Sequence, residues 1–198
     1  MSQFLDRHEP IHETKGNLPH WTQYGKITFI TFHLADSLPK HVIDFMQAEY
    51  NLLKLQLEKE NYPTNLVRLK AIRHNQLEKY LDKGYGSCLL SSPIFRNVIV
   101  NTLNYNNGNT FLLHSYVIMP NHVHLLLEPI GENTIQQITH SIKSFSSHEI
   151  NKLRHSTGSI WQKEFFDRII RNEDHYMRVL EYIKNNPKHC SPTEFTLY

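Results

Sequence analysis

Several features that would place a protein in a well-known class are missing from these 198 residues. Only two cysteines are present, Cys88 and Cys190, and they lie far apart in the sequence. This excludes a disulfide framework and a Cys-x-x-Cys zinc motif, so a reducing cytoplasmic location is expected. No run approaches the roughly 20 apolar residues of a membrane-spanning helix, and the first ten residues contain no apolar signal segment. We therefore expect a soluble protein that is not exported and has no membrane partner.

The chain also lacks a large excess of charge of either sign. The chain has 21 Lys and Arg against 19 Asp and Glu, a formal net charge of +2, which neither supports nor excludes a nucleic-acid partner. A hydrophobic content of 39% over this length suits one core, so a single domain over residues 1–198 is predicted.

Histidine, by contrast, is abundant, with 14 residues. His122 and His124 stand two positions apart in the apolar run 119–128, and alternate side chains of a strand point to the same face. Two neighbouring imidazoles are half of a metal site. In a chain this rich in histidine, such a pair also arises by chance, and the alternative is an ordinary polar surface.

The spacing of apolar residues predicts the secondary structure. Residues 1–24 are polar and without a period, which indicates an irregular N-terminal arm. Residues 27–34 alternate β-branched and aromatic side chains, as a strand does. From 38 to 84 the period is helical, with a break at Tyr62–Pro63, and we interpret this segment as a helical hairpin inserted into the domain. The apolar stripes that predict the two helices are Val42, Met46, Tyr50, Leu53 and Leu57, then Leu66, Leu69, Ile72, Gln76 and Tyr80.

The inserted hairpin has two interpretations, a DNA-guiding or partner-binding appendage and a packing insert. It does not contain the histidine pair, so we expect it to lie outside any catalytic core. After it come a helix with Ser92 at its N-cap, strands at 110–118 and 122–128, a helix capped by Thr134, a strand at 165–170 and a final helix capped by Asn172. Without the insert, this order predicts an α+β fold with a ferredoxin-like split β-α-β core, an antiparallel four-stranded sheet and a C-terminal helix.

Four segments in this order resemble the REP-associated tyrosine transposases, which are relatives of the small single-strand transposases in the HUH (His-hydrophobic-His) nuclease superfamily. The segments are Met119–Glu128, His140–Phe145, Ile160–Glu173 and Tyr182–Pro187. The resemblance runs from about residue 25 to about residue 189, with a poorly matched stretch in the middle. The HUH nucleases share the predicted core, and their last helix is catalytic.

The resemblance implies a role for each motif residue. Tyr182 would be the nucleophile, and Asn186 would join His122 and His124 as a ligand of a divalent metal, Mg or Mn, of which imidazole favours Mn. The reaction would be cleavage of single-stranded DNA through a 5′-phosphotyrosyl intermediate, followed by strand transfer, at hairpin-forming repeat elements. A free phenol, with a pKa of about 10, needs a nearby cation or base for this attack. Taken singly, Tyr182 is one of 10 tyrosines that by default pack in a core, and Asn186 merely ends a helix.

Other residues are predicted to contact DNA. Lys143, Arg168 and Arg171 are candidates for phosphate contacts, and Trp161 for stacking on an unpaired base. The alternative is a solvated surface for the three cations and a core position for Trp161.

Three other functions are compatible with parts of the pattern. A DNA-hairpin-binding protein that no longer cuts would have no need of the four motif residues, and an unrelated metal hydrolase would need a further ligand cluster, such as His-Glu-x-x-His, that the chain lacks. A nickase of the relaxase or replication-initiator kind would use the same chemistry on another substrate. The protein is expected to be a monomer or a homodimer, with the monomer favoured.

Overall fold

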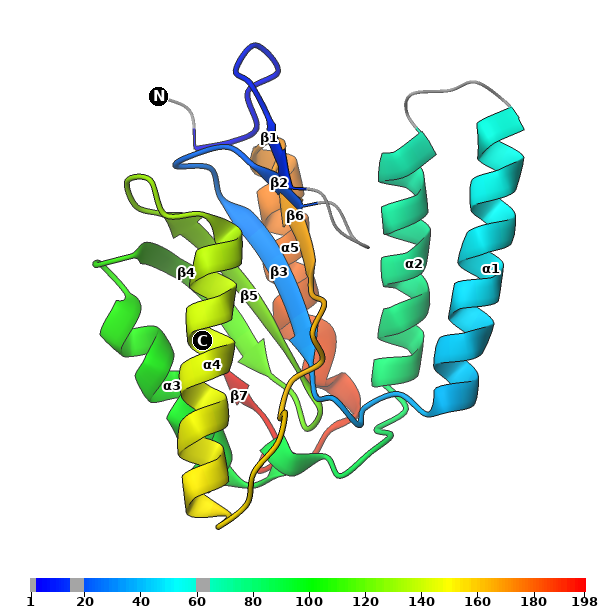
Figure 1. The fold of residues 1–198 in the computed structure, drawn as a ribbon. Helices are drawn as coiled ribbons and strands as arrows, with labels where there is room; N and C mark the ends of the chain where they lie inside the picture. Colours follow the sequence, from blue (N-terminus) through cyan, green and yellow to red (C-terminus); the bar gives the residue numbers. More distant parts are fainter. Residues whose placement is uncertain (1–2, 15–19, 60–64) are drawn as a thin grey trace.

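A computed structural model describes residues 3–14, 20–59 and 65–198 (Figure 1). A five-stranded sheet forms the centre, with the strand order β6-β3-β5-β4-β7 and antiparallel pairing throughout. The strands are β3 (Thr28–His33), β4 (Phe111–Ile118), β5 (His122–Pro129), β6 (Phe166–Ile169) and β7 (Thr196–Leu197). The helices are α1 (Lys40–Lys59), α2 (Asn65–Leu81), α3 (Pro93–Asn106), α4 (Ile135–Leu153) and α5 (Glu173–Asn185).

The order β3-α3-β4-β5-α4-β6 is the predicted split β-α-β arrangement, and the α+β fold class is confirmed. The sheet has one strand more than the four predicted. The extra strand, β7, pairs with β4, and the backbone of Tyr198 exchanges hydrogen bonds with that of Tyr116 at 3.0 and 3.1 Å. A strand of two residues is too short to leave a periodic pattern in the sequence.

The two faces of the sheet are covered by different helices. Helices α3 and α4 lie against one face, and α5 lies against the other (Figure 1). Strand β5 follows this division residue by residue: Val123 and Leu125 pack in the cluster under α3 and α4, whereas Leu126 packs with Ile183 of α5. His122 and His124 alternate with Val123 and Leu125 along the strand. They therefore lie on the same face of the sheet as Leu126, as predicted from their spacing.

The predicted helix starts are found at or next to their capping residues. Thr134 accepts a hydrogen bond from the backbone nitrogen of Gln137, whose side chain bonds back to Thr134 in a capping box. The side chain of Asn172 accepts from the backbone nitrogen of His175 at 2.9 Å and so begins α5. Ser92 occupies the N-cap position before Pro93 but makes no side-chain capping bond.

The segment 38–84 forms the predicted helical hairpin of α1 and α2, beside the sheet edge formed by β6 (Figure 1). The predicted break at Tyr62–Pro63, and the side chains of Leu57 and Leu66, lie outside the described residues. The predicted buried face of α2 is partly wrong. Instead of Gln76 and Tyr80, which are half-buried, the helix buries Leu69, His74, Glu78 and Leu81.

The N-terminal arm is more ordered than predicted. Strands β1 (His12–Thr14) and β2 (His20–Thr22) pair with each other, and the Leu5 nitrogen donates to the Ile170 carbonyl next to β6. Two short 3-10 helices, η1 (Leu89–Ser91) and η2 (Asn186–His189), complete the elements described. Within the described residues, none of the helices combines the length and the apolar character that a membrane crossing requires.

Candidate active site

The two histidines of the His-x-His pair are buried on β5. His122 is 1% exposed and His124 is fully buried, and their ring centroids lie 4.8 Å apart with the planes at 74°. In the register of the sheet, His122 lies opposite His33 of β3 and His124 lies opposite Thr31. The period of the strand thus places both imidazoles on one face, where they meet residues of α2 and α5.

Polar neighbours orient both rings. Asn121 Oδ1 accepts a hydrogen bond from His122 Nδ1 at 2.8 Å, so the proton of the neutral ring is on Nδ1 and the lone pair of Nε2 is free. Thr31 Oγ1 lies 2.8 Å from Nδ1 of His124. The Asn121 amide in turn donates to the carbonyl of Leu81 at the end of α2, at 3.0 Å. Such outer partners hold metal-binding imidazoles in position in known metal sites.

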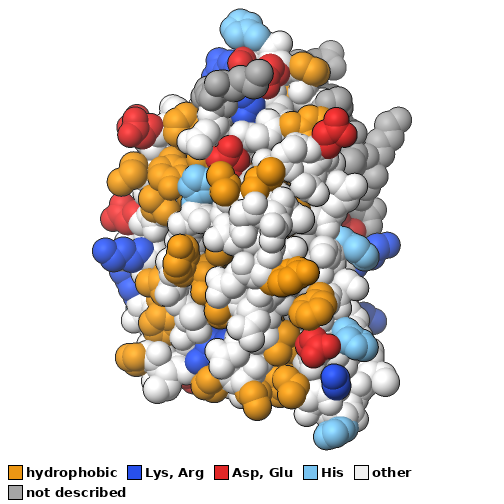
Figure 2. Space-filling view, turned by 90° about the vertical axis from the view of Figure 1, so that its left-hand side faces the viewer, with side chains coloured by type: hydrophobic (Ala, Val, Ile, Leu, Met, Phe, Trp, Pro, Cys, Tyr) orange, Lys and Arg blue, Asp and Glu red, His pale blue; other side chains and the backbone are white. Residues whose placement is uncertain are grey.

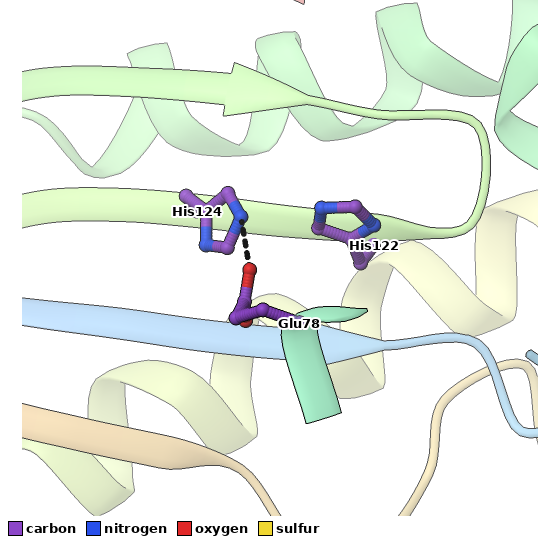
Figure 3. Close-up of side chains that lie close together, drawn as sticks. All are labelled: Glu78, His122 and His124. Carbon is purple, nitrogen blue, oxygen red and sulfur yellow. Dashed lines mark ion pairs between the residues drawn. The ribbon is translucent and has the colours of Figure 1, made fainter. Parts of the chain in front are cut away.

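A carboxylate from α2 completes the cluster. Glu78 is 8% exposed, and its Oε2 lies 3.2 Å from His124 Nε2 (Figure 3). Among the described residues, one group of His, Cys, Asp or Glu side chains has its ligand atoms close enough to share a metal ion. That group is Glu78, His122 and His124, whose ligand atoms all lie within 4.8 Å of one another.

Unsatisfied polar atoms gather at this cluster. His122 Nε2, His124 Nε2, Glu78 Oε1 and Asn186 Oδ1 are all buried without a hydrogen-bond partner. Buried polar atoms are nearly always paired in native proteins, so several orphaned acceptors side by side need an explanation. Imidazole nitrogens and amide or carboxylate oxygens are ligands that divalent cations take, so the donor set fits a metal ion.

Helix α5 brings the predicted nucleophile to the same place. Tyr182 is 36% exposed, and its ring meets the ring of His124 edge-on at 5.2 Å and that of Phe29 at 5.8 Å. Its hydroxyl donates a short hydrogen bond to Oε2 of Glu78. Asn186, one helical turn on, lies next to both His122 and Tyr182, since its side chain affects the pKa of each. The four motif residues are thus brought together, as the sequence predicts.

Burial and charge set the protonation states. Burial lowers the pKa of His122 to about 3 and that of His74 to about 4, so both rings are neutral at pH 7. Burial alone would raise the pKa of Glu78, but His124 and His74 beside it bring that pKa well below its usual range. Burial and the Glu78 carboxylate raise the pKa of Tyr182 far above that of a free phenol. The resting site therefore holds an ionised carboxylate and a protonated tyrosine.

The structure corrects the role predicted for Trp161. The side chain is 3% exposed and packs edge-on against Phe32 at 4.8 Å in the core under α3 and α4. Its indole nitrogen donates to Ser146 Oγ at 2.9 Å. Stacking on an unpaired base would require Trp161 to leave this core, so the alternative interpretation, a core residue, is the correct one.

The three predicted cations differ in their surroundings. Lys143 donates to the carbonyls of Gln162 and Lys163 at 2.6 and 2.8 Å, and burial lowers its pKa to about 8. It therefore holds the segment before β6 in place. Arg168 lies on β6 with its guanidinium 5.4 Å from the Phe166 ring centroid, and Arg171 is exposed just beyond the strand. Both stay candidates for phosphate contacts.

Figure 2 shows the side of the molecule on which α3 lies. On the face of α3 and β4, Lys and Arg side chains are few and lie apart from one another (Figure 2). This view contains no continuous basic track among the described residues. Any contact of DNA with Arg168 and Arg171 would be made at the other edge of the sheet, where β6 lies.

Sequence reasoning missed the contribution of the inserted hairpin. Its α2 helix places Glu78 against His124 and Tyr182, so the prediction that the hairpin lies outside the catalytic core is wrong. His74, one turn earlier, stacks on Phe166 of β6 with ring centroids 3.7 Å apart. The signal available in the sequence was the spacing of His74 and Glu78, four apart on one helix face, which a search for apolar stripes overlooks.

The core places a His-x-His pair on its central sheet beside a tyrosine on its last helix and an asparagine at the end of that helix, which is the arrangement that the resemblance to transposases predicts. Consistent with this, the model of the family described as "Transposase IS200 like" matches residues 94–186, just under half of the chain. The matched part includes His122, His124, Tyr182 and Asn186, whereas Glu78 lies before it. The resemblance to transposases predicted from the motifs is confirmed.

Two relatives show how far the similarity extends. An uncharacterized protein of Haemophilus influenzae is 28% identical over 96 residues, which are 38% of this chain and 53% of that protein. The chain thus spans about half the length of this curated relative. The solved structure of a REP-associated tyrosine transposase bound to a REP hairpin is similar with a TM-score of 0.49 and 19% identity, over 86% of this chain and 72% of the other.

Proposed function

We propose that this protein is a transposase that cleaves single-stranded DNA with a divalent metal and transfers the strand through a 5′-phosphotyrosyl intermediate on Tyr182. One observation carries the proposal. His122 and His124 on β5 and Tyr182 and Asn186 at the end of α5 meet in one cluster, although about sixty residues separate the two pairs in the sequence. Folding alone gives no reason to bury His122 Nε2, His124 Nε2 and Asn186 Oδ1 without hydrogen-bond partners.

His122, His124 and Asn186 would hold the ion, which would be Mg²⁺ or Mn²⁺, with Mn²⁺ favoured by the imidazoles. When bound, it would supply Lewis-acid polarisation of the scissile phosphate. The neutral state of His122 suits this role, because its low pKa keeps the nitrogen lone pair available well below pH 7. Asn121 and Thr31 would keep the rings aimed at the ion.

Tyr182 would perform the attack. A bond forms between its phenolic oxygen and phosphorus, and the bond from phosphorus to the 3′ oxygen of the neighbouring nucleotide breaks. The phenolic proton is released, and the 3′ oxygen takes up a proton to become a hydroxyl. The phosphodiester energy is retained in the phosphotyrosyl bond, so the 3′ hydroxyl of another strand can reverse the reaction without an external cofactor. Strand transfer is therefore the natural outcome.

The substrate we infer is single-stranded DNA next to an imperfect hairpin. A site of this size without a helicase motif has no means of melting a duplex, whereas a strand already unpaired at the foot of a hairpin presents its phosphate to Tyr182. Arg168, on the same face of β6 as Phe166, and the exposed Arg171 would contact the backbone without reading sequence.

A single chain suffices for this reaction, because Tyr182 lies beside the histidine pair of its own chain. We therefore favour a monomer. A nickase of the relaxase or replication-initiator kind is the second candidate, since the same cluster would serve it. The two differ in whether the cut strand is passed to a second 3′ end.

The test uses one DNA sequence in three forms: a hairpin with a single-stranded flank, a plain single strand and a full duplex. Each is incubated with the protein and Mn²⁺, with EDTA as the control. We expect cutting in the flank beside the hairpin, weaker cutting of the plain strand and none of the duplex, and binding that weakens as salt rises. Joining of the cut strand to an added 3′ end would support transposition over nicking. Preferential cutting of the duplex, or equal cutting in EDTA, would overturn the proposal.

A further inference from the structure

The Glu78 carboxylate reaches the cluster from an element that the split β-α-β core does not require. It lies on α2, in the hairpin that interrupts the core between β3 and α3, and points from that helix toward the histidines of β5 (Figure 3). It also lies before the part of the chain that matches the transposase family model. A role for Glu78 is therefore particular to the hairpin.

We propose that Glu78 is a protein ligand of the divalent ion bound by His122 and His124, and that the ion thereby fastens the α1–α2 hairpin to the catalytic sheet. The inference rests on the proposed function for the presence of an ion. It goes beyond that function by giving the hairpin a part in the metal site.

The geometry of the carboxylate carries the first half of the proposal. One oxygen, Oε2, lies 3.2 Å from His124 Nε2 and accepts the hydroxyl of Tyr182. The other, Oε1, is buried and has no hydrogen-bond partner, with His74 Nδ1 at 3.5 Å. The carboxylate offers one oxygen to the group of Glu78, His122 and His124, whose ligand atoms all lie within 4.8 Å of one another. Glu78 is therefore placed to share an ion with the two histidines.

The charge of the site points the same way. His122, His124 and Asn186 are neutral ligands, so an ion held by them alone would keep its full double charge in a buried place. Hard divalent cations such as Mg²⁺ and Mn²⁺ prefer oxygen ligands, and carboxylates above all. Glu78 supplies the carboxylate of the group and would offset half of that charge.

The packing of α2 supports the second half of the proposal, that the ion fastens the hairpin to the sheet. The helix turns Leu69 and Leu81 inward, but between them it buries His74 and Glu78. Burying a carboxylate is costly unless it is paired, and here one oxygen is left without a partner. An ion shared by β5 and α2 would remove this cost, so hairpin docking and ion binding should reinforce each other.

The binding experiment uses the full chain without DNA, and Mn²⁺ as the probe. Free Mn²⁺ is followed by electron paramagnetic resonance during a titration of the wild type, Glu78→Gln, Glu49→Gln and His122→Ala. Glutamine keeps the size of Glu78 and an oxygen for the Tyr182 hydroxyl, so the fold should persist, as circular dichroism would check. Glu49 is the matched control, because it is a carboxylate of α1 that accepts from Gln76 at 2.7 Å and does not touch the histidines.

We expect Glu78→Gln to weaken Mn²⁺ binding by at least about 10-fold, the lower end of the effect known for groups that only support a ligand. Glu49→Gln should bind as the wild type does, and His122→Ala should bind more weakly than either. Wild-type affinity in Glu78→Gln, with loss in His122→Ala, would overturn the inference and leave the proposed function standing. No binding by the wild type would overturn both.

Amide hydrogen exchange tests the fastening. Saturating Mn²⁺ should slow exchange in the second half of α2, near Glu78, in the wild type and in Glu49→Gln, but not in Glu78→Gln. If Mn²⁺ slowed amide exchange equally in Glu78→Gln, or did not slow it in the wild type with Mn²⁺ bound, the ion would not be fastening the hairpin to the sheet. If Mn²⁺ binds through Glu78 but no DNA form is cut, the proposed function fails while this inference holds.

Discussion

Tyr182→Phe is expected to destabilise the protein even in the absence of DNA and metal. The change keeps the ring, which packs edge-on against Phe29 and His124, and removes only the hydroxyl that donates to Glu78. Hydrogen bonds to charged groups contribute about 1.5–3 kcal/mol. Glu78 is 8% exposed and loses its donor, but Tyr182 is 36% exposed, so water can replace part of the contact. We therefore expect a loss of roughly 1–2 kcal/mol in the free energy of unfolding.

The assay is urea unfolding at pH 7 in EDTA, supported by thermal scans. For a chain of this length the loss corresponds to a fall of roughly 2–8 °C in Tm. Tyr176→Phe is the matched control, because Tyr176 lies on the same helix and its hydroxyl meets His114 Nδ1, a neutral partner, at 3.1 Å. That variant should lose no more than about 1 kcal/mol.

A double-mutant cycle separates the hydrogen bond from other effects of the change. Glu78→Met removes the acceptor while keeping the length of the side chain, and combining it with Tyr182→Phe yields the coupling energy of the pair. A coupling below about 0.5 kcal/mol, or an unchanged free energy of unfolding in Tyr182→Phe, would refute the reasoning. The Glu78 carboxylate would then not hold the Tyr182 side chain in place.

Three further predictions concern the site and its surroundings. His122→Ala and His124→Ala should each lower DNA cleavage by at least about 100-fold while circular dichroism stays unchanged, since each removes a proposed ligand of the metal ion; normal cutting in Mn²⁺ by both would refute the metal site. Trp161→Phe should lower the free energy of unfolding by roughly 1–3 kcal/mol, through the lost bond to Ser146 and a cavity, and leave DNA affinity unchanged in a binding titration. Burial lowers the pKa of His33 and His74 from 6.5 to about 4, so their contribution to stability is complete above about pH 6.5 and is lost as the pH falls toward 4. Urea unfolding between pH 7 and 4 should show this loss, and a slope unchanged by His74→Gln would contradict it.

The parts of the fold that depend on local patterns could be predicted from the sequence. Side chains alternate between the two faces of β5, so His122 and His124 lie on one face whatever packs against it. The side chains of Thr134 and Asn172 cap the N-termini of α4 and α5 and so fix where these helices begin. Because these signals span only a few residues, neither the distant parts of the chain nor the insert disturbs them. The order of elements then left the split β-α-β core as the natural arrangement.

The parts that depend on distant contacts could not be predicted. Which face of α2 is buried is decided by Phe166 and His124, which come much later in the chain, and this sets Glu78 rather than Tyr80 against the site. Trp161 precedes β6, where a side chain can face solvent or core, and only the packing on Phe32 settles the choice. Polar residues that pack inward leave no apolar stripe, so the contact of Glu78 with His124 and Tyr182 could not be predicted from periodicity.

The most direct test of the central claim is the identity of the residue that becomes linked to DNA. The protein is incubated with Mn²⁺ and a hairpin carrying a single-stranded flank, denatured and digested, and the adduct is located by mass spectrometry. We expect a nucleotide joined through its 5′ phosphate to the peptide containing Tyr182, and no adduct with Tyr182→Phe. An adduct on another tyrosine, or cutting of the flank without any covalent intermediate, would contradict the central claim.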